Sequence, residues 1–218
     1  MQKLNIIKDK IKEIVERKQL KTNPQIIAIS KKFDLDVIEP LIHSGHNHFG
    51  ENVVQEAEKK WLILKNYNKN LKLHMVGKLQ TNKAKKAVKL FDYIHSLDNV
   101  KLATKLSQFE KELDKKIKIF IQVNLGKEKQ KSGISLDNLN EFYSYCKNKL
   151  NLNIIGLMCI PPIDSDTNQY FKSLKECSNN LSLKELSMGM SSDYENAVLN
   201  DGTFLRIGTA IFGERKPN

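Results

Sequence analysis

Short apolar runs alternate with longer amphipathic segments along the whole sequence, and this alternation constrains the fold more than any other feature. The apolar runs are too short for helices and rich in branched residues, which is typical of strands buried on both faces. Strands that alternate with helices pair in parallel through right-handed crossovers. The pattern predicts an α/β fold, a single (β/α)8 TIM barrel in preference to an open doubly wound sheet. The eight strands are expected near Ile26, His48, Leu73, Tyr93, Ile119, Ile155, Leu186 and Leu205.

An additional helix is expected before the first strand, because the apolar positions of residues 4–14 repeat at helical spacing. A further helix is expected over residues 37–42, where Pro40 should shorten or kink it since proline lacks a backbone N–H donor. A chain of 218 residues is long enough for one large core, and no glycine- or proline-rich linker divides it. Residues 1–218 are therefore predicted to form a single domain.

The formal net charge of +11 raises the question of a nucleic-acid partner. Nearly all the basic residues are lysines, whereas grooves that read phosphates and bases favour the planar guanidinium group of arginine. Scattered lysines therefore predict a solvated surface and no nucleic-acid partner. A nucleic-acid face remains the alternative, and its binding would weaken steeply with salt. Its lysines, about one helical turn apart, would be Lys78, Lys83, Lys85, Lys86 and Lys89.

No membrane partner and a cytoplasmic location are predicted. No apolar run approaches the roughly 18 residues that a membrane-spanning helix needs, and the charged N-terminal segment has no signal-peptide core. Three cysteines, an odd number without metal-type spacing, predict reduced thiols. His43, His46 and His48 lie close together in the sequence, but a metal site usually needs a further, well-spaced ligand. No metal is predicted.

The candidate site lies where the strands of the barrel end and the following loops begin. The first strand runs into Lys31, and inward-facing neighbours Ile27 and Ile29 would partly desolvate its amine. Desolvation lowers the pKa of an ammonium group and frees the amine to form a Schiff base. Lys32 would point to the opposite face, because side chains alternate along a strand. The alternative is that one of many surface lysines falls at this position by chance.

The loops after the last two strands predict a phosphate site. Gly189 and Gly208 allow close backbone approach or unusual dihedral angles, and Ser191 and Thr209 supply hydroxyl groups. Arg206, one of three arginines, would lie at the barrel mouth, unless it simply pairs with an acidic neighbour. A lysine on the first strand and a phosphate site after the last two are the layout of a pyridoxal-phosphate barrel.

The sequence also resembles the pyridoxal phosphate homeostasis protein family, the YggS-like proteins that are also called proline synthetase co-transcribed homologues. The matching segments follow the family order and span nearly the whole chain; SMGMS followed by RIGTAIFG, with SK and GEN upstream, is the specific part. They are IIAISK (26–31), FGENVVQEA (49–57), LHMVGKLQTNKAK (73–85), IHSLDNVKLA (94–103), QVNLGKEKQKSGI (122–134), GLMCIPP (156–162), LSMGMSSDYENAV (186–198) and LRIGTAIFG (205–213).

The resemblance implies a barrel similar to the N-terminal domain of alanine racemase that holds pyridoxal 5′-phosphate as an internal aldimine. Lys31 matches the Schiff-base lysine, and Arg206 matches the arginine that faces the pyridine nitrogen. Asn52 matches a position that lines the cofactor pocket, and Lys131 lies in a matching motif without an assigned role. The phosphate-contacting positions are matched by Ser187, Ser191, Gly208 and Thr209.

The resemblance further implies a monomeric carrier or buffer of intracellular pyridoxal 5′-phosphate, with PLP-dependent apoenzymes as candidate partners. An arginine at the pyridine nitrogen makes the ring a weaker electron sink. Racemisation also needs a second acid–base group, which alanine racemases take from another domain and subunit. The sequence ends at Asn218, soon after the eighth strand, so no such domain is expected and no enzymatic activity is predicted. A weak PLP-dependent amino-acid racemase is the alternative.

Overall fold

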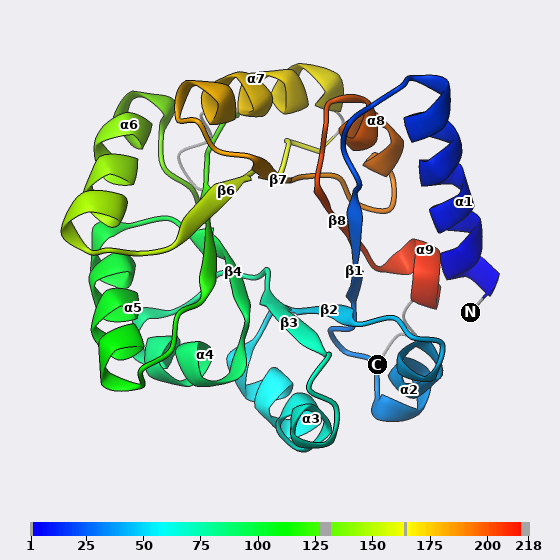
Figure 1. Cartoon of the computed structure of the whole chain (residues 1–218), viewed down its shortest axis with the longest axis horizontal. Helices are drawn as coiled ribbons and strands as arrows, with labels where there is room; N and C mark the ends of the chain where they lie inside the picture. The colour runs from blue at the N-terminus through cyan, green and yellow to red at the C-terminus, as the bar shows by residue number, and fades with distance from the viewer. Residues whose placement is uncertain (1, 127–131, 164, 215–218) are drawn as a thin grey trace.

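The structure, a computed structural model, describes residues 2–126, 132–163 and 165–214. Its centre is a closed barrel of eight parallel strands in sequential order, with the first strand paired to the last (Figure 1). All eight strands lie where the sequence predicts them, which confirms the (β/α)8 fold. They are β1 (Gln25–Ile29), β2 (His48–Glu51), β3 (Lys72–Met75), β4 (Tyr93–Leu97), β5 (Lys118–Gln122), β6 (Ile154–Met158), β7 (Glu185–Ser187) and β8 (Phe204–Ile207).

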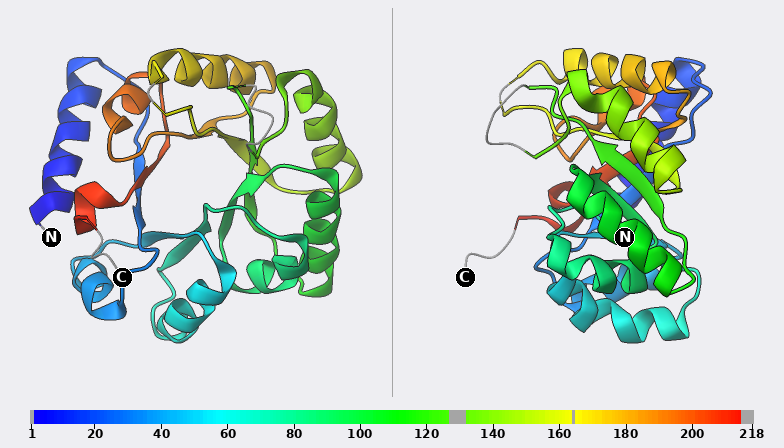
Figure 2. Two further views of the ribbon diagram at one scale, coloured as in Figure 1. Left: turned by 180° about the vertical axis from the view of Figure 1, so that it is seen from behind. Right: turned by 90° about the vertical axis from the view of Figure 1, so that its left-hand side faces the viewer.

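The helices form a ring around the barrel, which Figure 2 shows from behind and from the side. The expected additional helix, α1 (Gln2–Arg17), precedes β1 and packs against α8 and α9. A 3-10 turn, η1 (Thr81–Lys83), leads into α4, and a π-helical turn, η2 (Tyr145–Lys149), follows α6. The other helices are α2 (Leu35–His43), α3 (Val54–Tyr67), α4 (Ala84–Leu90), α5 (Val100–Glu112), α6 (Leu136–Ser144), α7 (Thr167–Asn180), α8 (Tyr194–Leu199) and α9 (Thr209–Phe212). None of these helices is long and apolar enough to cross a membrane.

Pro40 does not end helix α2, which continues to His43. Proline removes only one backbone donor, and the carbonyl of Pro40 still accepts the backbone N–H of Ser44 (3.1 Å). Helix α2 is longer at both ends than the residues 37–42 that the sequence predicts, and the Pro40 hydrogen bond accounts for its C-terminal end.

Two apolar cores flank the strands, because side chains alternate between the barrel interior and the helices. Ile26 and Ala28 of β1 belong to the large core between strands and helices. Ile27 and Ile29 point inward, as the sequence predicts, and pack in the small core that fills the barrel. Phe120 of β5 belongs to this inner core and is fully buried. Side chains thus fill the barrel interior, as is usual for a barrel of eight strands.

Candidate cofactor site at the barrel mouth

A cavity of about 340 Å³ lies at the C-terminal ends of the strands. Six of the seven predicted binding residues line it, and Ser187 lies underneath Arg206. The structure thereby joins residues from the two ends of the sequence, because β1 pairs with β8. The lining residues are Ile29, Lys31, Asn52, Val76, Ile160, Met190, Ser191, Ser192, Arg206, Gly208 and Thr209.

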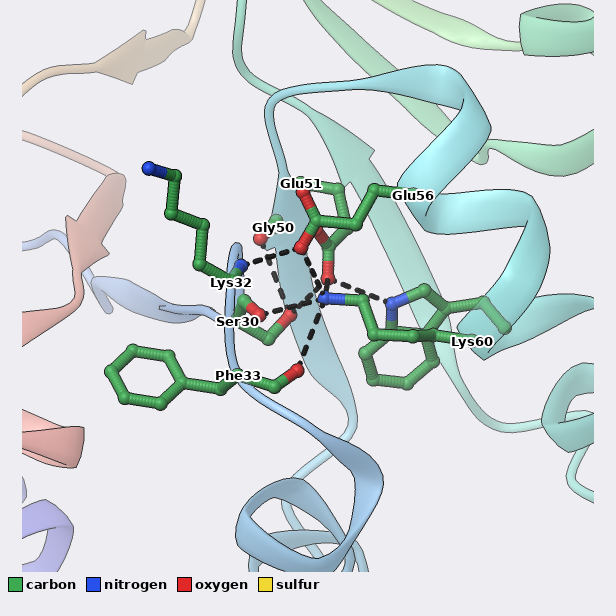
Figure 3. Close-up of polar contacts among 8 residues, drawn as sticks. Ser30, Lys32, Phe33, Gly50, Glu51, Glu56 and Lys60 are labelled. Carbon is green, nitrogen blue, oxygen red and sulfur yellow. Dashed lines mark hydrogen bonds and ion pairs between the residues drawn. The ribbon is translucent and has the colours of Figure 1, made fainter. Parts of the chain in front are cut away.

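Lys31 lies in a tight turn immediately after β1. The backbone N–H of Ser30 donates to the carbonyl of Gly50 (3.0 Å), and the N–H of Phe33 donates to the carbonyl of Ser30 (3.2 Å). Lys32 adopts a left-handed backbone conformation with a φ of 63° and is exposed. Its side chain points away from the neighbouring polar groups in Figure 3 and does not line the cavity. Of this lysine pair, Lys31 lines the cavity, and the reason is the turn that follows β1 instead of the alternation of side chains along a strand.

Buried Lys60 of α3 holds the turn that carries Lys31 (Figure 3). Its Nζ atom donates to the carbonyl oxygens of Ser30 (2.8 Å) and Phe33 (3.4 Å), on either side of Lys31. The same atom pairs with Oε1 of Glu56 (2.9 Å), which also accepts the backbone N–H of Lys32. One ammonium group therefore anchors the turn on both sides of the candidate Schiff-base lysine.

The charge of Lys60 is balanced by Glu51, a fully buried carboxylate at the end of β2. Oε1 of Glu51 lies 2.6 Å from Nζ of Lys60 and accepts hydrogen bonds from Ser30 Oγ (2.7 Å) and Trp61 Nε1 (3.0 Å). Burial raises the pKa of Glu51, while Lys60, Trp61 and Ser30 act in the opposite direction. Loss of either Lys60 or Glu51 would leave the other charge buried without its partner. Because Lys60 also binds two carbonyl oxygens of the Lys31 turn, the same loss would disturb the turn.

Arg206 of β8 is a buried cation in the wall of the cavity, with 5% of its surface exposed. Nη1 donates to Ser187 Oγ (2.7 Å) and Nη2 donates to the carbonyl oxygen of Cys159 (2.8 Å). Burial lowers the pKa of Arg206. Among the described residues no carboxylate forms an ion pair with Arg206, although the charge of Asp193 raises its pKa and so opposes the effect of burial.

Ser191, in the loop after β7, accepts hydrogen bonds from the backbone at the start of α9. Its Oγ atom accepts the N–H groups of Gly208 and Ala210, both at 3.2 Å. Two amides thus converge on one oxygen beside the cavity, an arrangement that also suits an oxygen of a phosphate group. Thr209, between them, lines the cavity.

Of the two glycines that the sequence singles out, only Gly189 has an unusual backbone conformation. Its φ is 85°, and a Cβ atom there would lie 2.5 Å from Cβ of Ala197. At Gly208 φ is −116°, and an added Cβ would make an ordinary contact of 3.5 Å with Cβ of Ile29. The protein's own packing requires glycine at 189 but not at 208.

The lysines of the alternative nucleic-acid face include two that form ion pairs on the surface. Lys85 pairs with Glu112, and Nζ of Lys86 lies 2.8 Å from Glu58 Oε2. These pairs fit the predicted solvated surface. Among the histidines near β2, His46 Nε2 donates to the carbonyl of His48 (2.9 Å), and within the described ranges no group of three side chains is placed to hold a metal ion. Lys131 lies outside the residues that the structure describes.

Four buried polar residues near the site were not singled out from the sequence. Glu51 and Lys60 support the Lys31 turn, and His74 and His95 lie inside the barrel, both fully buried. The two histidines carry a signal in the sequence, because each lies in a short strand directly after a residue that packs in the outer core, Leu73 before His74 and Ile94 before His95. A polar residue at an inward position of a buried strand must find a hydrogen-bond partner, which marks it for attention.

Comparison with known proteins places the chain in a family that has this barrel. The chain belongs to the alanine racemase N-terminal domain family, whose model matches residues 3–216. A similar full-length relative is the pyridoxal phosphate homeostasis protein of Aquifex aeolicus, 36% identical over 225 residues, covering 99% of this chain and 98% of that protein. The protein of the same name in a Synechocystis strain is 37% identical over 200 residues, covering 88% and 91%. These matches confirm the resemblance drawn from the sequence motifs.

Solved structures agree with the fold. PipY of Synechococcus elongatus, in the form with PLP bound, superposes with a TM-score of 0.82 at 35% identity and covers 93% of this chain and all of that one. An alanine racemase of Clostridium difficile superposes with a TM-score of 0.71 at 13% identity, which shows the fold alone. The present chain covers 56% of that racemase, so the similarity extends over its barrel-sized part.

Proposed function

We propose that this protein, folded as one domain, binds pyridoxal 5′-phosphate at the barrel mouth and serves as a cytoplasmic carrier or buffer of this cofactor. One observation carries the proposal: a single cavity brings together Lys31, the amide cluster around Ser191 and the buried cation Arg206. Relatives of similar length are named pyridoxal phosphate homeostasis proteins, and PipY has been solved with PLP bound.

The residues present fit the three chemical features of this cofactor. Pyridoxal 5′-phosphate supplies an aldehyde with which a lysine amine condenses, with loss of water, and Lys31 is the lysine that lines the cavity. Ser191, Gly208 and Thr209 would hold the phosphate: Oγ of Ser191 accepts two backbone N–H groups, so its own hydroxyl hydrogen would be directed to the ligand, and Thr209 supplies a second hydroxyl group at the cavity. Arg206 would donate to the ring nitrogen with guanidinium hydrogens that its contacts with Ser187 and Cys159 leave available.

The other two predicted binding residues are Asn52 and Ser187. Asn52, which follows Glu51 in the sequence, lines the same cavity as Lys31. Ser187 is fully buried, and its hydroxyl contacts Arg206 and His95, so we assign it to holding Arg206 in position instead of contacting the phosphate. A cavity of about 340 Å³ is also within the usual range for small-molecule sites, roughly 300–1,000 Å³.

A carrier fits the cavity better than an enzyme does. The ionisable side chains among the described lining residues are those of Lys31 and Arg206. Arg206 would leave the ring nitrogen without a proton, which weakens electron withdrawal into the ring. Racemisation needs a second group that can exchange a proton on the other face of the substrate, and the described lining offers none.

The test is reductive trapping of the bound cofactor. The full-length protein, mixed with pyridoxal 5′-phosphate, is expected to show a visible absorption band and, after borohydride reduction, a stable adduct on Lys31 detected by mass spectrometry. Lys31→Ala should abolish both signals, and Lys32→Ala, the matched control on the neighbouring exposed lysine, should retain both. Absence of the band at saturating cofactor, or equal trapping in Lys31→Ala, would contradict the proposal.

Two further assays separate the carrier from its alternatives. The loaded protein should reactivate a PLP-dependent apoenzyme, whereas racemisation of alanine or serine that Lys31→Ala abolishes would establish the racemase instead. Nucleic-acid binding that weakens steeply with salt would support the lysine-rich face. Sedimentation of the loaded protein tests the proposed monomer.

A further inference from the structure

Inside the barrel, His48, His74 and His95 form one hydrogen-bonded row, called here the histidine row. Nδ1 of His48 lies 2.9 Å from Nε2 of His74, and Nδ1 of His74 lies 2.9 Å from Nε2 of His95. Nδ1 of His95 lies 2.7 Å from Ser187 Oγ, which also accepts a hydrogen bond from Arg206. The row starts at His48, the first residue of β2, and at its other end His95 contacts Ser187, which in turn contacts the cavity residue Arg206.

Aromatic packing fixes the rings of the row in place. His74 stacks on Tyr93 with ring centroids 4.1 Å apart, and His95 stacks on Phe120 with centroids 4.3 Å apart. Both histidines are fully buried. Each ring therefore presents its two nitrogens in fixed directions, one towards each neighbour in the row.

Burial favours the neutral form of all three histidines. Burial lowers the pKa of His74 and His95 well below its ordinary value of 6.5, with neighbouring histidines and Arg206 acting in the same direction. Burial lowers the pKa of His48 to about 4, with Lys72 and Lys118 adding to the effect and Asp92 opposing it. A neutral imidazole has one donor and one acceptor nitrogen, so every hydrogen bond in the row needs its proton on one defined side.

Only one direction of donation satisfies the hydroxyl of Ser187. If His95 donated from Nδ1, Oγ of Ser187 would accept from both His95 and Arg206, and its own proton would have no acceptor among its hydrogen-bond contacts. A buried donor without a partner costs about 1–3 kcal/mol. If Ser187 donates to His95, each hydrogen bond of the row has one donor and one acceptor.

We propose that the histidine row has a single polarity, with the proton of each ring on Nε2, and that it thereby positions Arg206. The hydroxyl group of Ser187 donates a hydrogen bond to Nδ1 of His95, and its oxygen accepts the hydrogen bond from the guanidinium group of Arg206. His95 then donates to His74, and His74 donates to His48. Ser187, His95 and His74 are positioning residues in this arrangement. The assignment of protons stands on the protein alone, whereas its effect on a ligand at Arg206 rests on the proposed function.

The first test is nitrogen NMR of the ligand-free, full-length protein labelled with ¹⁵N-histidine, because protonated and unprotonated ring nitrogens have well-separated shifts. At neutral pH, His48, His74 and His95 should each show a proton on Nε2. His46 is an internal reference, since its Nε2 atom faces the carbonyl of His48 and must carry the proton. A proton on Nδ1, or a mixture of both forms, at His74 or His95 would overturn the proposal.

The second test removes the hydroxyl that sets the direction. In Ser187→Ala, Nδ1 of His95 loses its donor, so the form with the proton on Nδ1 should become populated at His95 and then at His74. The His46 signals should not change. Unchanged signals at His95 in this variant would show that Ser187 does not set the polarity. The wild-type spectrum decides the first prediction even if the variant does not fold.

The third test measures the consequence for Arg206. His95→Asn keeps a short acceptor for Ser187, whereas His95→Phe keeps the aromatic stacking on Phe120 and removes the acceptor. The dissociation constant for pyridoxal 5′-phosphate should rise about tenfold in His95→Phe, the loss expected for one hydrogen bond at the upper end of its usual range. The rise should be under about threefold in His95→Asn, and the pH dependence of the visible band should change only in His95→Phe.

Equal dissociation constants and equal pH profiles in these two variants would overturn the positioning of Arg206. If the wild-type protein binds no pyridoxal 5′-phosphate, the proposed function fails, while the NMR tests still decide the polarity of the histidine row. The two failures are therefore distinguishable.

Discussion

At the scale of single residues, Lys60 connects the stability of the protein to its candidate site. Most of the lysines are exposed, but the side chain of Lys60 is only 10% exposed and that of its partner Glu51 is fully buried. The ammonium group contacts both sides of the Lys31 turn. A substitution at Lys60 should thus affect both the free energy of unfolding and the chemistry of a residue that it does not touch.

Lys60→Met is expected to lower the free energy of unfolding by about 3–5 kcal/mol, since it leaves the carboxylate of Glu51 buried without its partner. Urea denaturation measures the loss. The double variant Lys60→Met with Glu51→Gln should recover a large part of it, because the uncompensated charge is gone. Lys86→Met is the matched control, whose exposed pair with Glu58 should contribute less than about 1 kcal/mol. A loss in Lys60→Met no larger than in Lys86→Met would contradict the expectation.

The buried histidines predict a loss of stability in mild acid. Burial lowers the pKa of His46 and His48 from 6.5 to about 4 in the folded protein. The unfolded chain therefore takes up these protons first, and the free energy of unfolding falls as the pH drops from about 6.5 to about 4. Urea midpoints at pH 7, 6 and 5 should follow this direction.

His46→Gln provides the control for the pH dependence. The variant should have a flatter profile between pH 6.5 and 4, by at most about 1.4 kcal/mol per pH unit. Glu51, whose pKa burial raises, acts in the opposite direction in the wild type and in the variant alike, so it does not affect the difference. Identical slopes in the two proteins would show that His46 is protonated equally in the folded and unfolded states.

The sequence identifies the residues of the site whose position on a strand implies their role. Lys31 and Arg206 follow from the rule that barrel sites lie at strand ends, and both line the cavity. Lys60 could not be distinguished from the many other lysines, because its role depends on Glu51 and on carbonyls of a distant turn. The partners of a buried charge are set by tertiary packing, which a single sequence does not encode in local pattern.

At the scale of elements, the turn between β7 and α8 depends on Gly189. A left-handed backbone conformation and a close approach to Ala197 coincide there, whereas Gly45, after α2, has the same φ of 85° with nothing within 4 Å of an added Cβ. An alanine at Gly45 would have only the cost of the backbone conformation, whereas an alanine at Gly189 would also have the cost of the steric contact with Ala197.

Gly189→Ala should lower the free energy of unfolding by about 1–3 kcal/mol more than Gly45→Ala, because overpacking adds to a backbone cost that the two variants share. Chemical denaturation of both variants gives the difference. Equal losses would mean that Ala197 moves away without cost. Because this turn leads to Ser191, Gly189→Ala should also weaken binding of pyridoxal 5′-phosphate, whereas Gly45→Ala should not.

The elements were largely predictable because each strand is a short apolar run and each run lies between amphipathic segments. Even β7, with three residues, was found at its predicted place near Leu186. Helix α2 covers residues 35–43 and not 37–42, because backbone hydrogen bonds decide where a helix begins and ends and the local sequence pattern does not show them. The contacts among His48, His74 and His95 were not predictable, since they depend on the register between neighbouring strands.

At the scale of the whole molecule, a ligand that binds only the folded protein should stabilise it by mass action. Pyridoxal 5′-phosphate at about 100 times its dissociation constant should raise the free energy of unfolding by about 2.7 kcal/mol. The thermal midpoint measured with and without the cofactor tests this. Lys31→Ala should show a smaller shift at the same cofactor concentration, while Lys32→Ala should match the wild type, and an equal shift in all three proteins would place binding elsewhere.

The pairing of β1 with β8 has a consequence for when the protein becomes able to bind. Lys31 follows the first strand made by the ribosome, whereas Arg206 and the amides near Ser191 belong to or follow the last. A nascent chain that has not yet released β8 already contains α1 to α8 and eight of the eleven lining residues, but it lacks Arg206, Gly208 and Thr209. Chains arrested before the eighth strand should therefore bind the cofactor more weakly, and a borohydride pulse should label them less than chains that have passed it.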